Sequence, residues 1–302
     1  MKLLSGPVAA MVTPFRKDGA VDTRKIPKLL RFLYDRGITG IWACGTSGEV
    51  MSLSVEERQR ILEVTVKETA GYAPVVAHVG HPSTAVSVKL ARHARRVGAT
   101  ALAACPPYPP MPTFQAILAH YQAIAAAGEL PFYAYMVSIL VPVELTVGMV
   151  ARIAKHLSVV GIKWTSADVQ AVERLRRLAG GGLNVMSGFD ELALACQAMG
   201  ADGSVGLGHN AMPEGFAALH ELMSQEKVAA AHAQQAAYND FSAALPAGAN
   251  IFARAKEVLR LRGIDVGTTR MPTQAPDATA RKAIARAWER YATRSAAAEH
   301  LR

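Results

Sequence analysis

Residues 159–164, Val-Val-Gly-Ile-Lys-Trp, form a short apolar run that carries a lysine at its end. The run predicts a buried strand, and because strand side chains alternate between two faces, Val159, Gly161 and Lys163 would share one face. An ammonium group in such a position is poorly solvated, and desolvation lowers the pKa of a lysine. A neutral amine is the nucleophile that Schiff-base chemistry requires. The stretch therefore predicts a reactive lysine, against the alternative of a lysine that ends a strand at the surface.

Seven further short apolar runs resemble this one, and segments with helical composition separate them. Short buried strands that alternate with helices predict a parallel sheet. Eight such units favour a closed (β/α)8 barrel, a TIM barrel, over an open sheet. The predicted strands cover residues 8–12, 38–44, 75–79, 100–104, 131–137, 159–163, 183–187 and 203–207.

Capping residues indicate where several helices begin. Asp22 is placed to cap the first helix, and Ser54 with Glu57 three residues later has the pattern of a capping box. From about residue 221 onward the pattern is purely helical. We therefore divide the chain into a barrel, residues 1–220, that carries the active site, and a C-terminal helical extension, residues 221–302, that packs on the barrel. The helices predicted in this extension cover residues 226–245, 251–262 and 277 onward.

The composition excludes several classes of protein. Apolar residues make up 51% of the 302 residues, so a sizeable core is expected. The formal net charge of +9 comes from Arg and Lys residues scattered along helical segments, without a basic stripe or a recognition motif for nucleic acid. A basic surface that mildly favours anionic small molecules is the simpler interpretation.

Cysteine usage and the first residues indicate the compartment. Cys44, Cys105 and Cys196 are odd in number and widely spaced, so neither a disulfide framework nor a zinc site is predicted. Pro7 interrupts the apolar residues near the start, which leaves them too short for a signal peptide or a membrane helix. We expect a cytoplasmic protein that does not interact with membranes.

Chemically active side chains follow several of the predicted strands. In a barrel of this kind the active site lies at the C-terminal ends of the strands. The second strand leads into residues 45–49, Gly-Thr-Ser-Gly-Glu, whose glycines let backbone amides approach an anion and whose hydroxyls donate hydrogen bonds. Tyr108 follows the fourth strand, Tyr135 ends the fifth, Lys163 ends the sixth, and residues 187–191 follow the seventh. A lysine, a phenol and an anion cradle are therefore predicted to meet at one rim.

Taken together, these residues resemble the dihydrodipicolinate synthase / N-acetylneuraminate lyase family of class I, Schiff-base aldolases. The resemblance runs from about residue 6 to about residue 213. Tyr135 lies 28 residues before Lys163, and Thr46 lies 117 residues before it, which agrees with the family. The residues that carry the resemblance are Thr13-Pro14-Phe15, the turn at 45–49, residues 53–58, Tyr135, residues 160–163 and Ser187-Gly188.

The resemblance implies a catalytic role for four residues. Lys163 would attack the ketone of a 2-oxo acid, typically pyruvate, and form an imine. Tyr135 would carry protons to and from the imine carbon and the substrate oxygen. Thr46 and Tyr108 would complete that relay, although the loop around Tyr108 carries one residue more than the family has.

The resemblance also implies the residues that hold the substrate. Thr46 and Ser47, with their backbone amides, would bind its carboxylate. Gly188 and the carbonyl of Val205 would make backbone contacts near the lysine.

Other positions depart from one branch of the family or the other. Asp190 and Glu191 are similar to the acidic pair with which the sugar-acid lyase branch binds substrate hydroxyls, yet that branch's serine falls on Leu207 here. The arginine with which the synthase branch holds its second carboxylate falls on Leu140. Trp164 either narrows the pocket or packs under a loop. The chain therefore matches neither well-known member fully, and we expect poor use of aspartate semialdehyde and better cleavage of a 4-hydroxy-2-oxo acid.

The sequence thus predicts a lyase, an aldolase that acts on a 2-oxo acid through Lys163. Three alternatives stay open: a true 4-hydroxy-tetrahydrodipicolinate synthase, a dehydratase of keto-deoxy sugar acids, and a non-catalytic barrel that only binds a 2-oxo acid. No cofactor is expected, because imine chemistry needs none. No metal is expected either, since His78 and His81 lack an evident third ligand. The family resemblance implies a homo-oligomer, either a dimer or a tetramer.

Overall fold

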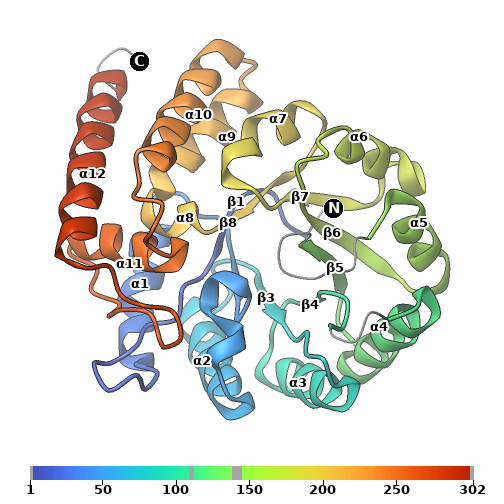
Figure 1. Ribbon diagram of the computed structural model, residues 1–302. Helices are drawn as coiled ribbons and strands as arrows, with labels where there is room; N and C mark the ends of the chain where they lie inside the picture. The colour runs from blue at the N-terminus through green and yellow to red at the C-terminus, as the bar shows by residue number, and fades with distance from the viewer. Residues whose placement is uncertain (1–2, 109–111, 138–144, 300–302) are drawn as a thin grey trace.

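The computed structural model describes residues 3–108, 112–137 and 145–299 of the chain. Eight parallel strands form a closed barrel in which each strand pairs with the next along the sequence and β8 closes on β1 (Figure 1). The predicted (β/α)8 barrel is therefore confirmed. The strands are β1 (Gly6–Ala10), β2 (Gly40–Ala43), β3 (Val75–His78), β4 (Ala101–Ala104), β5 (Phe132–Val137), β6 (Val159–Thr165), β7 (Asn184–Ser187) and β8 (Gly203–Gly206).

Helices surround the barrel, and the last of them in the sequence extend it on one side (Figure 1). Helices α8 to α12 follow β8, and the predicted helical C-terminus is confirmed over the described residues. The helices are α1 (Ile26–Tyr34), α2 (Val55–Thr69), α3 (Thr84–Val97), α4 (Phe114–Gly128), α5 (Val147–His156), α6 (Gln170–Arg177), α7 (Ala193–Ala198), α8 (Gly208–Ala211), α9 (Pro213–Ser224), α10 (Val228–Ala243), α11 (Ile251–Leu261) and α12 (Ala278–Glu299).

One predicted cap is confirmed and the other is wrong. At the start of α2 the Ser54 hydroxyl accepts from the Glu57 amide at 3.1 Å, while the Glu57 carboxylate accepts from the Ser54 amide at 2.9 Å. Asp22 instead accepts from the Arg24 guanidinium, and it makes no capping hydrogen bond. A 3-10 turn at Thr23–Lys25 intervenes before α1 begins at Ile26, so a neighbouring arginine competes successfully for the carboxylate.

The pairing of β5 with β6 decides which side chains meet. Tyr135 on β5 lies directly opposite Lys163 on β6. The register is irregular at the start of β6, where Phe132 pairs with Val159 and Tyr133 pairs with Gly161. A Cβ atom at Gly161 would lie 2.3 Å from the Tyr133 ring. Glycine at this position therefore lets the ring fill the barrel below Lys163.

The C-terminal helical region shares its core with the barrel. Leu259, Ile264 and Val266 belong to the same apolar cluster as the barrel strands. A second cluster joins Met212, beside the last strand, to residues of α10, α11 and α12 such as Phe241. The helical extension therefore packs closely against the barrel.

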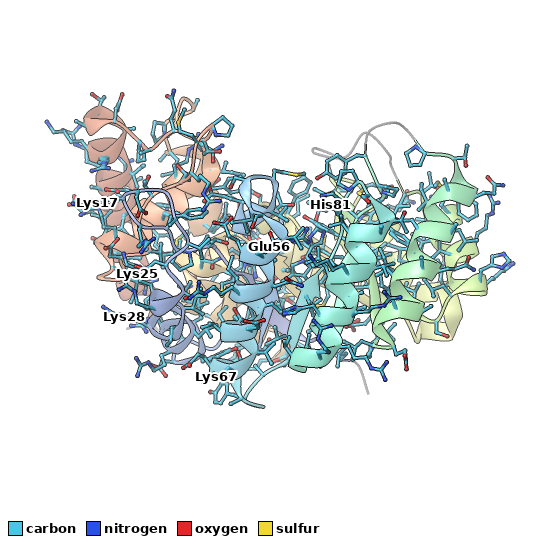
Figure 2. The ribbon with its side chains drawn as sticks, turned by 90° about the horizontal axis from the view of Figure 1, so that it is seen from below. Lys17, Lys25, Lys28, Glu56, Lys67 and His81 are labelled. Atoms are coloured by element: carbon cyan, nitrogen blue, oxygen red, sulfur yellow. The ribbon has the colours of Figure 1, made fainter. Side chains whose placement is uncertain are left out.

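Charged side chains cover the outside of the molecule. Lys17, Lys25 and Lys28 are labelled on one side of the molecule in Figure 2, and Glu56 and Lys67 lie on α2. Within the described ranges, none of the helices has both the length and the apolar character of a membrane span.

Candidate active site

A cavity of about 340 Å³ lies where strand ends, the loops that follow them and the C-terminal helices meet. Lys163, Tyr135, Thr46 and Ser47 all line it, as the sequence predicts. Other residues that line it are Thr165, Gly188, Asp190, Glu191, Val205, Leu207, Met212, Tyr238, Phe241, Ser242, Leu245, Ile251, Phe252, Arg254 and Val258.

Lys163 is a buried lysine, with only 4% of its surface exposed. Its Nζ lies 4.6 Å from the centroid of the Tyr135 ring and 5.3 Å from that of Trp42. Burial lowers the pKa of Lys163 to about 7, and the negative charge of Asp190 opposes that shift only in part. A substantial fraction of the amine is therefore neutral near pH 7, and a neutral amine is nucleophilic.

Tyr135 lies beside Lys163 with its hydroxyl 3.4 Å from Oγ1 of Thr46. Burial raises the pKa of the Tyr135 phenol to about 12, although hydrogen bonds with Thr46 and Thr165 lower it. The phenol is therefore protonated at neutral pH and has a proton to give. The structure thus brings together three predicted residues: the lysine, the phenol and the Thr46 hydroxyl.

The predicted anion cradle is a 3-10 turn at Thr46–Gly48. The amide of Glu49 donates to the Thr46 carbonyl at 2.9 Å, and Glu49 adopts the left-handed conformation with φ of 59°. Behind the turn, Oγ1 of Thr13 donates to the Gly48 carbonyl at 2.7 Å. The first amides of such a turn have no acceptor within it, so they are available to an anion.

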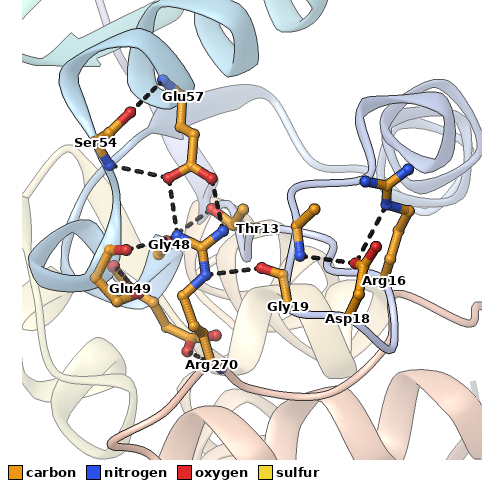
Figure 3. Close-up of polar contacts among 11 residues, drawn as sticks. Thr13, Arg16, Asp18, Gly19, Gly48, Glu49, Ser54, Glu57 and Arg270 are labelled. Carbon is orange, nitrogen blue, oxygen red and sulfur yellow. Dashed lines mark hydrogen bonds and ion pairs between the residues drawn. The ribbon is translucent and has the colours of Figure 1, made fainter.

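The C-terminal region holds the cradle from behind (Figure 3). Nζ of Lys256 on α11 donates to Oε1 of Glu49 at 2.6 Å, and both side chains are almost fully buried. The Arg270 amide donates to the other Glu49 oxygen at 3.1 Å. The Arg270 guanidinium pairs with Glu57 and donates to the Gly19 carbonyl. Segments far apart in the sequence therefore fix the turn that contains Thr46 and Ser47.

Gly188 and Val205 also line the cavity. The Gly188 amide donates to the Trp164 carbonyl at 2.9 Å. A Cβ atom at position 188 would lie 1.8 Å from Oγ1 of Thr165, so no larger residue fits without a shift. Trp164 itself is buried, and its indole N–H donates to the Asp168 carbonyl at 3.0 Å. Of the two interpretations of Trp164, packing under a loop is therefore the one that holds.

Asp190 and Glu191 reach the cavity, and each already accepts a hydrogen bond from a protein group. Asp190 accepts from the Gly208 amide at 2.8 Å and contacts Nδ1 of His209 at 2.9 Å. Glu191 accepts from the Ser242 hydroxyl at 3.0 Å. Burial raises the pKa of Glu191, and the neighbouring Asp190 raises it further. The proposed binding of substrate hydroxyls by this pair stays a prediction.

Tyr108 is not among the residues that line the cavity of its own chain. Its hydroxyl lies 2.6 Å from Sδ of the exposed Met51. Its predicted role in the proton relay stays a prediction. Leu140, where the synthase branch has its arginine, lies outside the described residues.

The histidine that ends β3 and the one shortly after it have structural partners. His78 is buried and its Nδ1 lies 3.1 Å from the Cys44 carbonyl. Burial lowers the pKa of His78 to about 3, and the charge of Arg58 adds to this effect. Nδ1 of His81 accepts from the Ser83 amide at 2.9 Å. Nδ1 of each imidazole therefore has a partner within the protein.

Sequence reasoning missed the part of the cavity wall that comes from α10 and α11. Phe241, Leu245 and Val258 make this wall apolar, and Arg254 is its cation. The helical period of these segments predicts an apolar face, but nothing in the sequence indicates that the face closes the mouth of the barrel. The sequence alone therefore does not identify Arg254 as a residue of the site.

A parallel (β/α)8 barrel with a buried, partly neutral lysine next to a protonated phenol defines a class of enzyme: the Schiff-base lyases, or class I aldolases. The comparisons with known proteins agree. The chain belongs to the dihydrodipicolinate synthetase family, whose model matches residues 3–290.

Solved structures and sequence relatives agree with this assignment. A 4-hydroxy-tetrahydrodipicolinate synthase of Geotalea uraniireducens is 36% identical over 217 residues, which are 72% of this chain and 74% of the relative. A Ruminococcus gnavus sialic acid aldolase is 29% identical with a TM-score of 0.93, covering 97% of this chain and 98% of the other. The 4-hydroxy-tetrahydrodipicolinate synthase of Methylacidiphilum fumariolicum SolV is 26% identical with a TM-score of 0.91, covering 99% of each chain. Both branches of the family are therefore among its neighbours.

Proposed function

We propose that this enzyme cleaves and forms a carbon–carbon bond of a 4-hydroxy-2-oxo acid, with pyruvate as the 2-oxo acid partner. The observation that carries the proposal is the buried Lys163 amine 4.6 Å from the Tyr135 ring. A pKa of about 7 for this amine suits a nucleophile at neutral pH.

The proposed reaction proceeds through an imine. Nζ of Lys163 attacks C2 of the 2-oxo acid, and the ketone oxygen leaves as water. The C4 hydroxyl of the bound substrate then loses its proton while the C3–C4 bond breaks, so that an aldehyde leaves and the electron pair enters the protonated imine as an enamine. Tyr135 supports this step because it lies within reach of a proton relay with Thr46.

The last steps return the enzyme to its starting state. A proton adds to C3 of the enamine, and water hydrolyses the imine to release pyruvate and the free amine. No electrons are gained or lost, so the reaction needs no oxidant or reductant. Condensation is the same sequence in reverse.

Other features support the proposed setting. Thr46 and Ser47 suit the substrate carboxylate because their turn lies on the same cavity as Lys163. The three cysteines are free and buried, which suits the reducing cytoplasm. We also propose that the chain forms a homo-oligomer, as the family resemblance implies, with a solution mass that is a multiple of the 32.1 kDa chain.

The experiment that tests the imine is reductive trapping. Incubation with pyruvate and borohydride should leave a reduced pyruvyl adduct on Lys163, which peptide mass spectrometry locates. Lys163→Arg should abolish the adduct because a guanidinium stays protonated. Lys67→Met, which removes an exposed lysine of α2, should leave it unchanged. Absence of an adduct at saturating pyruvate, or an adduct on another lysine, would refute the proposal.

A further inference from the structure

The part of the cavity wall that the C-terminal helices form carries an arginine whose buried Nε has no hydrogen-bond partner among the described residues. Arg254 lies in the first turns of α11, and it lines the cavity together with Ile251 and Phe252. Its Nε is buried, and this N–H finds no hydrogen-bond acceptor among the described residues. Burial lowers the pKa of the guanidinium, yet an arginine keeps its charge at neutral pH. A charged side chain with one unsatisfied buried donor therefore lines the cavity.

Three carboxylates on the same helix, on α10 and on the cavity wall already have other partners. Glu257, on the same helix, pairs with Arg260 at 2.6 Å. Glu191, which lines the same cavity, accepts from Ser242 and forms no ion pair within 4.0 Å of Arg254. Asp240 of α10 pairs with Arg294 at 2.6 Å. None of these three carboxylates therefore forms an ion pair with Arg254 that would explain an arginine at this position of the cavity wall.

The surroundings of Arg254 make a ligand anion the natural complement. Phe241, Leu245 and Val258 line the same part of the chain's C-terminal wall and offer no acceptor from their side chains. A charge-assisted hydrogen bond strengthens when apolar groups exclude water. The first turn of α11 also borders the cavity, and the positive end of a helix dipole favours an anion there.

The shape of the donor indicates which anion fits. A guanidinium presents its N–H groups as a planar fork that matches the two oxygens of a carboxylate. A phosphate dianion normally needs several donors, whereas Arg254 is the one arginine or lysine besides Lys163 among the described residues that line this cavity.

We propose that Arg254 binds a second carboxylate, at the aldehyde end of the substrate, so that the enzyme prefers 4-hydroxy-2-oxo dicarboxylic acids. The inference rests on the proposed function, because it assigns the part of the substrate that lies beyond the bond cleaved at Lys163. The proposed cation lies on α11. It is therefore at a different position from the arginine of the synthase branch, which Leu140 replaces in this chain.

The test compares aldehydes that differ only in charge. Condensation with pyruvate is measured for succinic semialdehyde and for butanal. Butanal has the same number of carbon atoms, with a methyl group in place of the carboxylate. The native enzyme should show a kcat/KM for succinic semialdehyde at least about 10-fold above that for butanal. Arg254→Met should lower the succinic semialdehyde value by roughly 10- to 100-fold and change the butanal value by less than about threefold.

A matched control lies on the same helix. Arg260 is half exposed and pairs with Glu257, so Arg260→Met should leave the ratio of the two kcat/KM values unchanged. Arg254→Lys keeps the charge but loses the fork, and it should recover only part of the preference. Were Arg254→Met to unfold, the native ratio and the lysine variant would still test the inference.

Several outcomes would overturn the assignment. One is a native enzyme whose kcat/KM for butanal equals that for succinic semialdehyde. Another is a folded Arg254→Met variant that loses both activities equally, and a third is a higher kcat/KM for glyceraldehyde 3-phosphate than for succinic semialdehyde. Trapping of pyruvate on Lys163 needs no aldehyde, so an intact adduct in these experiments separates failure of this inference from failure of the proposed function.

Discussion

Lys163 and Tyr135 respond to the same burial in opposite directions. Desolvation disfavours whichever form of a group is charged. It therefore lowers the pKa of the lysine to about 7 and raises that of the phenol to about 12. At neutral pH the lysine therefore supplies an electron pair and the tyrosine supplies a proton, although both lie in the same buried environment.

The first prediction concerns the pH dependence of imine formation. Only the neutral amine attacks, so the rate of pyruvate trapping should rise about tenfold per pH unit below pH 7 and level off above it. An ordinary lysine has a pKa of about 10.4, and its rate would still rise at pH 9. Stopped-flow measurement of imine formation from pH 5.5 to 9.5 gives the profile. A rate that keeps rising tenfold per unit through pH 9 would contradict the buried amine.

The second prediction concerns the proton relay. Tyr135→Phe keeps the ring next to Lys163 but removes the proton, so turnover of a 4-hydroxy-2-oxo acid should fall by roughly 10²–10⁴-fold. Steady-state kinetics and circular dichroism measure activity and folding together. Tyr34→Phe is the control, since Tyr34 lies on α1 with its hydroxyl on Thr69, away from the cavity. A fall of less than tenfold with normal folding would mean that another group carries the proton.

At the scale of elements, the barrel could be predicted because a short local pattern in the sequence indicates each strand. Apolar runs with helix caps and glycines between them identify the alternation of strands and helices, and the family motifs lie at strand ends. The exact starts of helices depend on competition between side chains. Asp22 illustrates this, because Arg24 takes the carboxylate that would have capped α1.

The third prediction concerns the contact between α11 and the anion cradle. Lys256→Met leaves the Glu49 carboxylate buried without its cation, which typically costs about 3–5 kcal/mol of the free energy of unfolding. The turn of Thr46 and Ser47 should also loosen, so the KM for pyruvate should rise. Urea unfolding and steady-state kinetics measure the two effects.

A double-mutant cycle separates this contact from general damage. Adding Glu49→Gln to Lys256→Met removes the unpaired charge, so the double variant should lose less stability than the sum of the two single variants. Lys67→Met, an exposed change on α2, should stay within about 0.5 kcal/mol of the native protein. A loss below 1 kcal/mol for Lys256→Met would show that the buried pair contributes little.

At the scale of the whole molecule, the active site depends on segments that only the tertiary fold brings together. Glu49 and Lys256 are 207 residues apart, and Arg270 is tied to Glu57 across 213 residues. Periodicity and caps carry no information about such pairs. The residues predicted from motifs, Lys163, Tyr135, Thr46 and Ser47, do line one cavity. Arg254 could not be predicted, because its place depends on how the C-terminal helices close the barrel.

The charges around the whole cavity lead to the last prediction, which concerns aspartate semialdehyde. This aldehyde has the carboxylate of succinic semialdehyde and, in addition, an ammonium group. Asp190 and Glu191, the cavity carboxylates among the described residues, already accept hydrogen bonds from protein groups. The protonated imine on Lys163 and the guanidinium of Arg254 would both repel the ammonium.

We therefore expect condensation of pyruvate with aspartate semialdehyde to have a kcat/KM at least about tenfold below that with succinic semialdehyde. It should also lie below the kcat/KM for retro-aldol cleavage of a 4-hydroxy-2-oxo dicarboxylic acid. The three reactions are measured side by side with one enzyme preparation. An aspartate semialdehyde value near 10⁵ M⁻¹s⁻¹, well within the ordinary enzyme range, would contradict this reading of the charges. The ammonium would then require a carboxylate freed from its present partners, and Glu191→Gln would be the variant that identifies it.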